Sequence, residues 1–512
     1  MEVMRGKMLA GLASLAFAAG AFANDTYTRV AFLDGLQEVP PNNTGARGYA
    51  TFQINPDTNT VNYRIAFSGL SAPETAAHVH GVAGPGVNAG VLFALPAGNP
   101  KVGSFTYAEA MQNDLLNGRM YVNIHTAAIP TGEIRGQIVS MVADLDGGQE
   151  TPPVATPARG VGLFNINTAT NQMEYYIIYG GLGSPETAAH IHGYQPHGLA
   201  AGVVHPLPSA NPKVGTWNYP QAEEQRILDG MTYVNIHTAV NGPGEIRGQI
   251  VSSVNPMDSL QETPPIPGAA AAGGGGLVAF NRATNTLTYD MRHQGLLSAQ
   301  TAAHIHGFAA PGASAGVLHN IGVGARMLGT WAFGAGAATN VFNGLTYFNV
   351  HTVGNAPGEI RGQIREGDLL PDCPVILAQP TDVTAAAGAT VSFAPVLHPD
   401  TPGPLNFQWR RNGTDIPPGQ PRFSGQNTAN LTINPVDPAD EGTYDVVITN
   451  GCGKPTISAG ATLDVTGCDS IDFNGDGLFP DNTDLEDFLS VFGGGPCSTG
   501  TCGDIDFNND GL

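Results

Sequence analysis

Large apolar residues alternate with smaller or polar residues along several short stretches of the chain. Residues 61–67 show this pattern, and residues 50–54 and 121–125 show it too. A period of two places successive side chains on opposite faces of a β-strand, so each stretch predicts a strand with one face on a core. Turn-forming residues fill positions 55–60, and only residues 108–117 suit a short helix. The pattern predicts an all-β fold built of antiparallel β-sandwiches or barrels.

The same pattern returns three times. The hexapeptide at residues 76–81, Ala-Ala-His-Val-His-Gly, recurs at 188–193 and 302–307, which gives a period of 112 and then 114 residues. The motifs Tyr-Val-Asn-Ile-His-Thr and Gly-Glu-Ile-Arg-Gly-Gln-Ile keep the same step, although the first reads Tyr-Phe-Asn-Val-His-Thr in the third repeat. A period of this length is that of an independent domain and not of a solenoid repeat. We therefore expect three tandem domains, at residues 25–142, 143–254 and 255–367.

The composition supports many short strands. The chain has 68 glycines and 39 prolines, which disfavour long helices. A glycine run at residues 273–276 predicts a flexible loop at the start of the third repeat. The net charge of −22 would repel a phosphate backbone, so nucleic acid is excluded as a partner.

The N-terminus has the pattern of a signal peptide over residues 1–23. Arg5 and Lys7 precede the apolar stretch 8–22, which ends in a small-x-small cleavage site before Asn24. A retained N-terminal anchor is the alternative. No later apolar run reaches the length of about 18 residues that a spanning helix needs, so we expect no membrane span after signal removal. We expect the protein to be secreted or displayed at the cell surface.

The repeated motifs resemble the CHRD domain, which is named after chordin and also found in microbial secreted proteins. The resemblance rests on His-aliphatic-His-Gly together with the two strand motifs above, and it covers residues 25–367. It implies an immunoglobulin-like β-barrel with a distant likeness to the copper–zinc superoxide dismutase sandwich. It does not imply an activity.

Paired histidines are the main chemical feature of each repeat. His78 and His80 project from the same face of a strand, about 6.6 Å apart. His125 follows 45 residues after His80, and that interval is the same in all three repeats. Three neutral imidazoles with an open position suit zinc or copper. The predicted ligands are His78, His80, His125, His190, His192, His237, His304, His306 and His351.

Further residues bear on this site. A carboxylate such as Glu133 is expected to accept the second ring N–H of a ligating histidine. His205 and His319 replace Phe93 of the first repeat, so they are possible fourth ligands. The alternative is that the histidines fix the packing of turns, and that Glu133 and Arg135 form a surface charge pair.

Residues 373–466 have a different β pattern that resembles an immunoglobulin domain. Trp409 corresponds to the buried tryptophan of strand C, and Tyr444 to the tyrosine corner. Phe393 and Val446 occupy the two positions of the usual disulfide between the sheets, so an apolar core is expected there. Nothing in this segment names a ligand.

All five cysteines follow residue 370, and an export compartment permits disulfides. Cys373 precedes the first strand of the immunoglobulin-like segment and Cys452 follows strand F. They are candidates for a disulfide at one end of the sandwich. The odd number leaves at least one thiol without an intramolecular partner.

The last segment, residues 467–512, carries two aspartate-rich loops. Oxygen side chains at positions 1, 3 and 5, followed by glycine at position 6, match the first half of a calcium loop. The expected calcium ligands are Asp472, Asn474 and Asp476 with the carbonyl of Leu478, and then Asp506, Asn508 and Asp510. A short helix is expected over 483–492. The segment resembles a dockerin module, truncated before its second helix; an acidic disordered tail is the alternative.

These patterns together favour an exported bacterial multidomain protein that binds or displays without catalysis. We expect the calcium-dependent tail to anchor it to, or assemble it with, an unknown extracellular protein or surface ligand. The alternative is a copper- or zinc-binding metalloprotein with dismutase-like units. An enzyme is the less favoured class, because a shared fold does not carry function and the chain has no Walker or dinucleotide motif.

Overall fold

A computed structural model describes residues 27–56, 58–168, 170–367, 374, 376–397, 405–450, 456–466 and 482–492. The expected signal peptide, all five cysteines with the candidate Cys373–Cys452 disulfide, and both expected calcium loops lie outside these residues. The chain divides into two compact units, Met1–Pro371 and Asp372–Leu512. Among the described helices, none combines the length and apolarity that crossing a bilayer requires.

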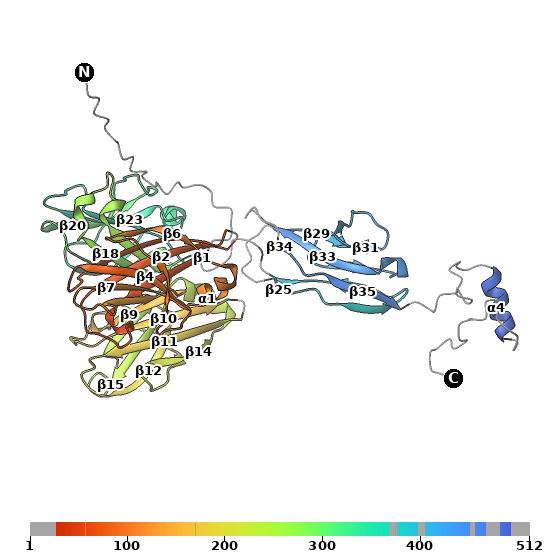
Figure 1. The fold of residues 1–512 in the computed structure, drawn as a ribbon, viewed down its shortest axis with the longest axis horizontal. Helices are drawn as coiled ribbons and strands as arrows, with labels where there is room; N and C mark the ends of the chain where they lie inside the picture. Colours follow the sequence, from red (N-terminus) through yellow and green to blue (C-terminus); the bar gives the residue numbers. More distant parts are fainter. Residues whose placement is uncertain are drawn as a thin grey trace, which may run out of the picture. The chain divides into compact units, whose positions relative to one another are not determined.

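The first compact unit contains three copies of one arrangement of two four-stranded sheets (Figure 1). In the first copy the strand orders are β1-β2-β3-β6 and β5-β4-β7-β8, with antiparallel neighbours. Its elements are β1 (Tyr27–Leu33), η1 (Gly35–Gln37), β2 (Arg47–Asn55), β3 (Thr60–Ser68), β4 (Glu74–Gly81), β5 (Val91–Ala94), β6 (Lys101–Thr106), η2 (Glu109–Met111), α1 (Gln112–Leu116), β7 (Met120–Thr126) and β8 (Ile134–Gln137). The short helix expected within 108–117 is confirmed.

The second and third copies repeat this order, with the two sheets joined through their first and last strands. The second copy comprises β9 (Met141–Asp146), η3 (Gly147–Gln149), β10 (Arg159–Asn167), β11 (Gln172–Gly180), β12 (Glu186–Gly193), β13 (Gly202–Pro206), β14 (Lys213–Asn218), η4 (Gln221–Glu223), α2 (Glu224–Leu228), β15 (Thr232–Thr238) and β16 (Ile246–Ile250). The third comprises β17 (Ser253–Asp258), η5 (Ser259–Gln261), η6 (Pro267–Ala269), β18 (Gly273–Asn281), β19 (Thr286–Gln294), β20 (Gln300–Gly307), β21 (Val317–Asn320), β22 (Arg326–Ala332), η7 (Ala335–Ala337), α3 (Ala338–Phe342), β23 (Thr346–Thr352) and β24 (Ile360–Ile364).

Each copy has its own apolar core between its sheets. In the first copy the alternation along β3 buries Val61, Tyr63 and Ile65, which meet Val79 and Val122 from the opposite sheet. The other two copies have equivalent cores. The all-β class predicted from the period of two is therefore confirmed.

The three copies also share a further apolar cluster, which the sequence did not predict. Val30, Val142 and Val254, from the first strand of each copy, are buried in it together with side chains from β2, β10 and β18. Two backbone bridges, between Val30 and Val139 and between Val142 and Val251, join the first strand of a copy to the segment that follows the last strand of the same copy. The tandem domains thus pack as one body around a common centre.

Ion pairs close these contacts into a ring. Equivalent aspartates, Asp34, Asp146 and Asp258, each receive an arginine from another copy. Arg159 of the second copy lies 3.2 Å from Asp34, and Arg64 of the first lies 2.7 Å from Asp258. Asp146 receives Arg292 and Arg326 of the third copy at 2.7 and 2.8 Å. Each copy therefore contacts both of the others.

The glycine run at 273–276 is not a flexible loop, and that prediction was wrong. These residues begin strand β18 and are buried. A Cβ on Gly275 would lie 2.2 Å from Cγ of Tyr49 in the first copy, and one on Gly276 would lie 2.4 Å from the ring of Phe348. The glycines are therefore needed because aromatic rings of two copies pack directly on this strand.

The second compact unit contains the immunoglobulin-like sheets. Their elements are β25 (Ile376–Ala378), β26 (Val383–Ala386), β27 (Val391–Phe393), β28 (Val396–Leu397), β29 (Asn406–Arg411), β30 (Thr414–Asp415), β31 (Phe423–Ser424), β32 (Leu431–Ile433), η8 (Pro438–Asp440), β33 (Gly442–Thr449), β34 (Thr456–Ile457) and β35 (Ala461–Thr466). Trp409 is fully buried, and the Tyr444 hydroxyl donates to the Asp440 carbonyl at 2.6 Å, as the tyrosine corner predicts. Phe393 stacks on Tyr444, with ring centroids 5.0 Å apart, and Val446 is buried, which confirms the apolar core. Helix α4 (Asn482–Phe492) corresponds to the helix expected over 483–492.

Candidate metal centre

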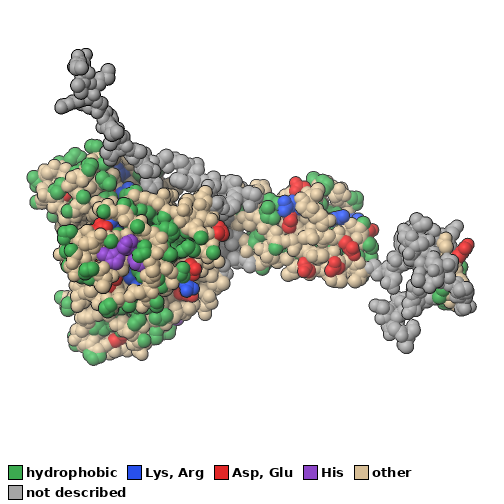
Figure 2. All heavy atoms as spheres, viewed as in Figure 1, with side chains coloured by type: hydrophobic (Ala, Val, Ile, Leu, Met, Phe, Trp, Pro, Cys, Tyr) green, Lys and Arg blue, Asp and Glu red, His purple; other side chains and the backbone are tan. Residues whose placement is uncertain are grey.

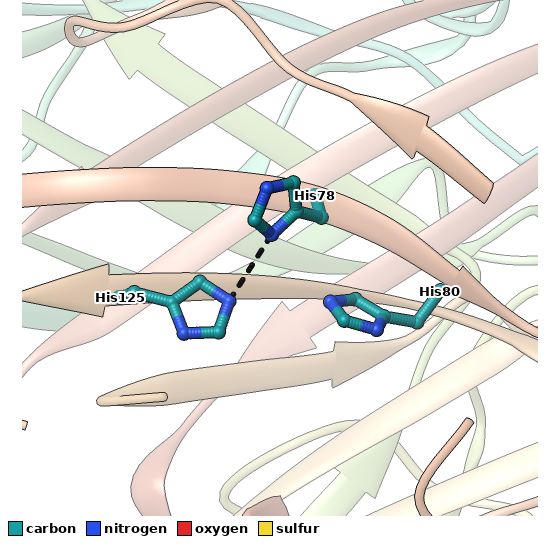
Figure 3. Close-up of side chains that lie close together, drawn as sticks. All are labelled: His78, His80 and His125. Atoms are coloured by element: carbon teal, nitrogen blue, oxygen red, sulfur yellow. Dashed lines mark hydrogen bonds between the residues drawn. The ribbon is translucent and has the colours of Figure 1, made fainter. Parts of the chain in front are cut away.

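The structure brings the three predicted histidines of the first copy together on the polar face of one sheet (Figure 3). His78 and His80 lie on β4, and His125 lies on the neighbouring strand β7, where it pairs in register with Ala76. The ring of His78 lies with its centroid 5.5 Å from that of His80 and 5.1 Å from that of His125. One ring nitrogen from each histidine lies within 4.8 Å of the other two.

Backbone carbonyls determine which nitrogens face the site. Nδ1 of His80 lies 3.0 Å from the carbonyl of Ala89, and Nδ1 of His125 lies 3.0 Å from that of Pro130. A carbonyl only accepts, so both rings carry their proton on Nδ1 and leave Nε2 as a lone pair. Nε2 of His125 lies 3.2 Å from Nδ1 of His78, and the buried Nε2 of His80 has no hydrogen-bond partner.

The other two copies repeat this arrangement. Nδ1 of His190 lies 3.2 Å from Nε2 of His237, and Nε2 of His192 is buried without a partner. In the third copy Nε2 of His306 lies 3.2 Å from Nε2 of His351, and Nδ1 of His304 has no partner. Carbonyls of Ala201, Gly242, Ala315 and Ala356 accept from the remaining Nδ1 atoms at 2.9 Å. Each copy therefore directs the same three nitrogens inward: Nδ1, Nε2 and Nε2.

The electrostatics of the site favour uncharged rings. Burial, reinforced by the neighbouring imidazoles, lowers the pKa of His78 and His80. The pKa values of His190, His192, His304 and His306 are lowered for the same reasons. Neutral imidazole is the form that binds a metal ion.

The nitrogen spacing also suits a metal ion. Two nitrogens bound to one tetrahedral zinc at about 2.0–2.1 Å lie about 3.3 Å apart. The closest pair in each copy is 3.2 Å apart. The residues present therefore fit a three-histidine site. A hydrogen bond between two rings would account for the closest pair of nitrogens. It would not account for the third nitrogen, which is buried without a partner in each copy.

Glu133 does not support the histidines as expected. Its carboxylate accepts hydrogen bonds from Thr44, Ser71 and Thr126 at 2.7–2.8 Å instead. Burial opposes its ionisation, but these hydrogen bonds outweigh burial, so the pKa of Glu133 is lowered. The carbonyls of Ala89 and Pro130 take the supporting role that was predicted for a carboxylate.

The interpretation of Glu133 and Arg135 as a surface charge pair is also wrong, because both side chains are buried. The guanidinium of Arg135 lies 3.5 Å from the ring centroid of Tyr121 and donates to the carbonyl of Val87 at 3.0 Å. Tyr121 stacks on His80, with centroids 5.0 Å apart, and its hydroxyl accepts from the amide of Ala89. Arg135 and Tyr121 thus hold the loop whose carbonyl orients His80.

His205 and His319 are not fourth ligands. His205 pairs in register with Ile191, so its side chain lies on the opposite face from His190 and His192. Its ring stacks on Trp217, and in the third copy Nε2 of His319 lies 3.2 Å from the hydroxyl of Tyr289. Both histidines pack with aromatic residues on the core side.

Histidine side chains of the first copy reach the molecular surface, over the strands that Figure 1 labels β4 and β7 (Figure 2). His78 and His125 are half-buried, whereas His80 is only 9% exposed. Val91 lies on β5, where it pairs with His80 of β4, and it is 54% exposed. The site is therefore open on one side, next to an exposed apolar residue.

Three carboxylates also come together, in the region where the copies meet. Asp144, Asp146 and Asp290 lie close enough to share an ion. Arg292 contacts all three at 2.7–3.3 Å, and Arg326 contacts two of them. These guanidinium groups already balance the charge of the three carboxylates. We therefore assign the cluster to the contacts between the copies and not to a metal site.

Comparisons with known proteins agree with the repeat. Residues 29–138, 141–250 and 254–364 each match the model of the CHRD domain, and residues 374–450 match that of the immunoglobulin domain. The chain is 27% identical to Chordin of Danio rerio over 237 residues, which is 40% of this chain and 25% of that protein. It is 24% identical to Chordin of Xenopus laevis over 249 residues, which is 43% of this chain and 26% of that protein.

The chain therefore spans about a quarter of the length of these two chordins. Among solved structures, titin M4 matches 19% of this chain and 99% of its own length, with 26% identity and a TM-score of 0.17.

Proposed function

Because this chain belongs to the CHRD domain family, through three copies of that domain, we propose that it is an extracellular binding protein in which each copy holds one copper or zinc ion. The observation that carries the proposal is the convergence of three imidazole nitrogens in every copy, one of them buried and unpartnered. Export is supported by the N-terminal charge and hydrophobicity pattern. In this proposal all three imidazoles of a copy coordinate the ion, so we propose binding and not catalysis.

The chain's own residues would supply most of the coordination. His78 through Nδ1, and His80 and His125 through Nε2, would hold the ion in the first copy. A copper or zinc ion there would act as a Lewis acid and would leave a coordination position open toward solvent. The exposed Val91 beside that position favours a partner with an apolar side chain next to its metal-binding group.

Metal content of the purified full chain tests the proposal. We expect about three equivalents of copper or zinc per chain after loading and desalting, one for each histidine cluster. Replacing His80 by alanine should remove one equivalent, and replacing His192 and His306 as well should remove all three. The matched control is His205→Ala, which removes a half-buried histidine of the same domain and should leave the content unchanged. A wild-type content no higher than that of the triple variant would refute the proposal.

We further propose that the tail anchors the protein in a calcium-dependent way. The support is the repeated Asp-x-Asn-x-Asp-Gly spacing at 472–477 and 506–511, and these residues lie outside the described part of the chain. Calorimetric titration of the calcium-free full chain should show binding that Asp472→Ala combined with Asp506→Ala abolishes. Equal heats for wild type and variant would contradict the proposal.

A further inference from the structure

A buried glutamate follows the first 3-10 turn of every copy. Glu38, Glu150 and Glu262 are 6%, 7% and 7% exposed. In each copy the carboxylate has a side-chain hydrogen-bond partner in an asparagine two positions before the third histidine. The side-chain amide of Asn123 donates to Oε2 of Glu38 at 3.3 Å, and that of Asn235 lies 3.5 Å from Oε2 of Glu150.

In each glutamate–asparagine pair, one carboxylate oxygen and the amide oxygen lack a hydrogen-bond donor. Oε1 of every one of these glutamates and Oδ1 of every one of these asparagines is buried without a hydrogen-bond partner; the six residues are Glu38, Asn123, Glu150, Asn235, Glu262 and Asn349. Carboxylate and amide oxygens only accept, so an ionised glutamate leaves both of these buried oxygens without a donor. A recurrence in three copies excludes an accident of one side-chain placement.

A glycine holds the two oxygens together. Gly132 has a φ of +133°, and a Cβ there would lie 2.5 Å from Oδ1 of Asn123 and 2.8 Å from Oε1 of Glu38. Gly244 and Gly358 show the same contacts, at 2.3 and 2.6 Å and at 2.2 and 2.6 Å. Both unpartnered oxygens therefore lie close to one point above the glycine, which no side chain could occupy.

We propose that Glu38, Glu150 and Glu262 are neutral carboxylic acids, each donating its Oε1 proton to Oδ1 of its asparagine while the asparagine amide donates to Oε2. The pair then makes two hydrogen bonds in a closed ring, and all four atoms are satisfied. This inference concerns the fold of the CHRD copies and does not depend on metal binding.

A proton explains the pair better than a cation. Calcium requires about six to eight oxygen ligands, and this site offers two. Each glutamate also lies near a buried arginine, namely Arg135, Arg247 or Arg361, which would repel a cation. The other charged groups facing the pairs are Asp146 for Glu150 and Asp258 for Glu262, and they favour the neutral acid. Burial raises the pKa of all three glutamates to about 7, in spite of the arginines.

The pairs would make the ring of copies sensitive to pH. Glu38 directly follows the 3-10 turn η1. Asp34 caps this turn and also forms an ion pair with Arg159 of the second copy. The folded state holds a proton that the unfolded glutamate loses above about pH 4.3. The unfolding equilibrium constant should therefore rise with pH by up to about tenfold per pH unit per glutamate, until pH passes the folded-state pKa near 7.

Infrared spectroscopy of the full chain tests the protonation directly. The variant Glu38→Gln with Glu150→Gln and Glu262→Gln keeps a donor facing each asparagine but cannot ionise. The difference spectrum of wild type minus variant at pH 6 should contain a protonated carboxyl band, which disappears with a midpoint near pH 7. Asp144 and Glu366, whose pKa values are also raised, are present in both proteins and cancel.

Thermal unfolding supplies the second measurement. Between pH 5 and pH 8 the melting temperature of the triple variant should fall less than that of wild type. The exposed Glu174→Gln is the matched control and should follow wild type. If the triple variant does not fold, Glu38→Gln alone should remove about one third of the carboxyl band. A carboxylate band in place of the protonated one at pH 6 would overturn the proposal, as would identical pH profiles for wild type and triple variant.

Discussion

A buried lysine in the first copy offers a sharp test of how charges are accommodated in this fold. Nζ of Lys101 is fully buried and donates to Oε1 of Glu74 at 2.5 Å and to the carbonyl of Pro96 at 2.8 Å. The third copy has Met327 and Gln300 at the two equivalent positions, with the amide nitrogen 3.8 Å from the sulfur. The same contact is therefore made by an ion pair in the first copy and by two uncharged side chains in the third.

The structure gives the size of each effect. Replacing Lys101 by methionine alone leaves the carboxylate of Glu74, whose side chain is 11% exposed, without its cation. Breaking a buried pair in this way costs about 3–5 kcal/mol. Adding Glu74→Gln removes the stranded charge and reproduces the third copy, so the double variant should lie within about 1 kcal/mol of wild type.

Urea unfolding of the full chain at pH 7 measures both free energies. The matched control is Arg119→Met, which breaks an ion pair with Asp114 whose side chains are 55% and 32% exposed. That variant should change the free energy of unfolding by less than about 1 kcal/mol. A Lys101→Met variant as stable as the control, or no recovery when Glu74→Gln is added, would refute the cost assigned to the stranded carboxylate.

Three further changes test the contacts within each compact unit. Gly275→Ala should destabilise the chain by about 1–3 kcal/mol in urea, because its Cβ meets the ring of Tyr49, and Tyr49→Val should restore part of the loss; equal stability of Gly275→Ala and wild type would contradict the packing. Asp258→Asn keeps the oxygen that caps η5 but strands the charge of Arg64, so we expect a loss of about 1–3 kcal/mol that 1 M salt reduces; no loss would argue against a closed ring. Trp409→Ala should cost the immunoglobulin-like unit about 3–5 kcal/mol and leave the CHRD transition unmoved in calorimetry; a shift of both transitions would contradict separate cores.

Local rules were enough to predict the strands and the meeting of the histidines. The period of two sets which side chains share a face, so His78 and His80 had to project together. The interval from His80 to His125 is the same in every repeat, which indicated that the third histidine lies on a partner strand. The register of β4 with β7 places His125 on that strand. Because these inferences depend on backbone periodicity alone, they did not require knowledge of tertiary contacts.

Contacts between distant segments were beyond the reach of the sequence. Arg135 looks like a surface residue in a strand motif, but the loop that covers it comes from residues 83–89, nearly fifty positions earlier. The carbonyls that orient the histidines carry no side-chain signature. The glycines at 273–276 resemble a linker until Tyr49, more than two hundred residues away, is seen to pack against them.

The ring explains why the three copies diverge on one face and not on the other. Each copy contributes its first two strands to the shared centre, where Tyr49, Val161 and Gly275 occupy equivalent register positions. Three identical faces could not fill that centre, because the ring of Tyr49 in the first copy needs the space that Gly275 leaves in the third copy. The histidine strands take no part in the shared cluster. The ring thus buries the sheet that varies and leaves the sheet that repeats accessible, which is the arrangement expected if the repeated sheet binds the same ligand three times.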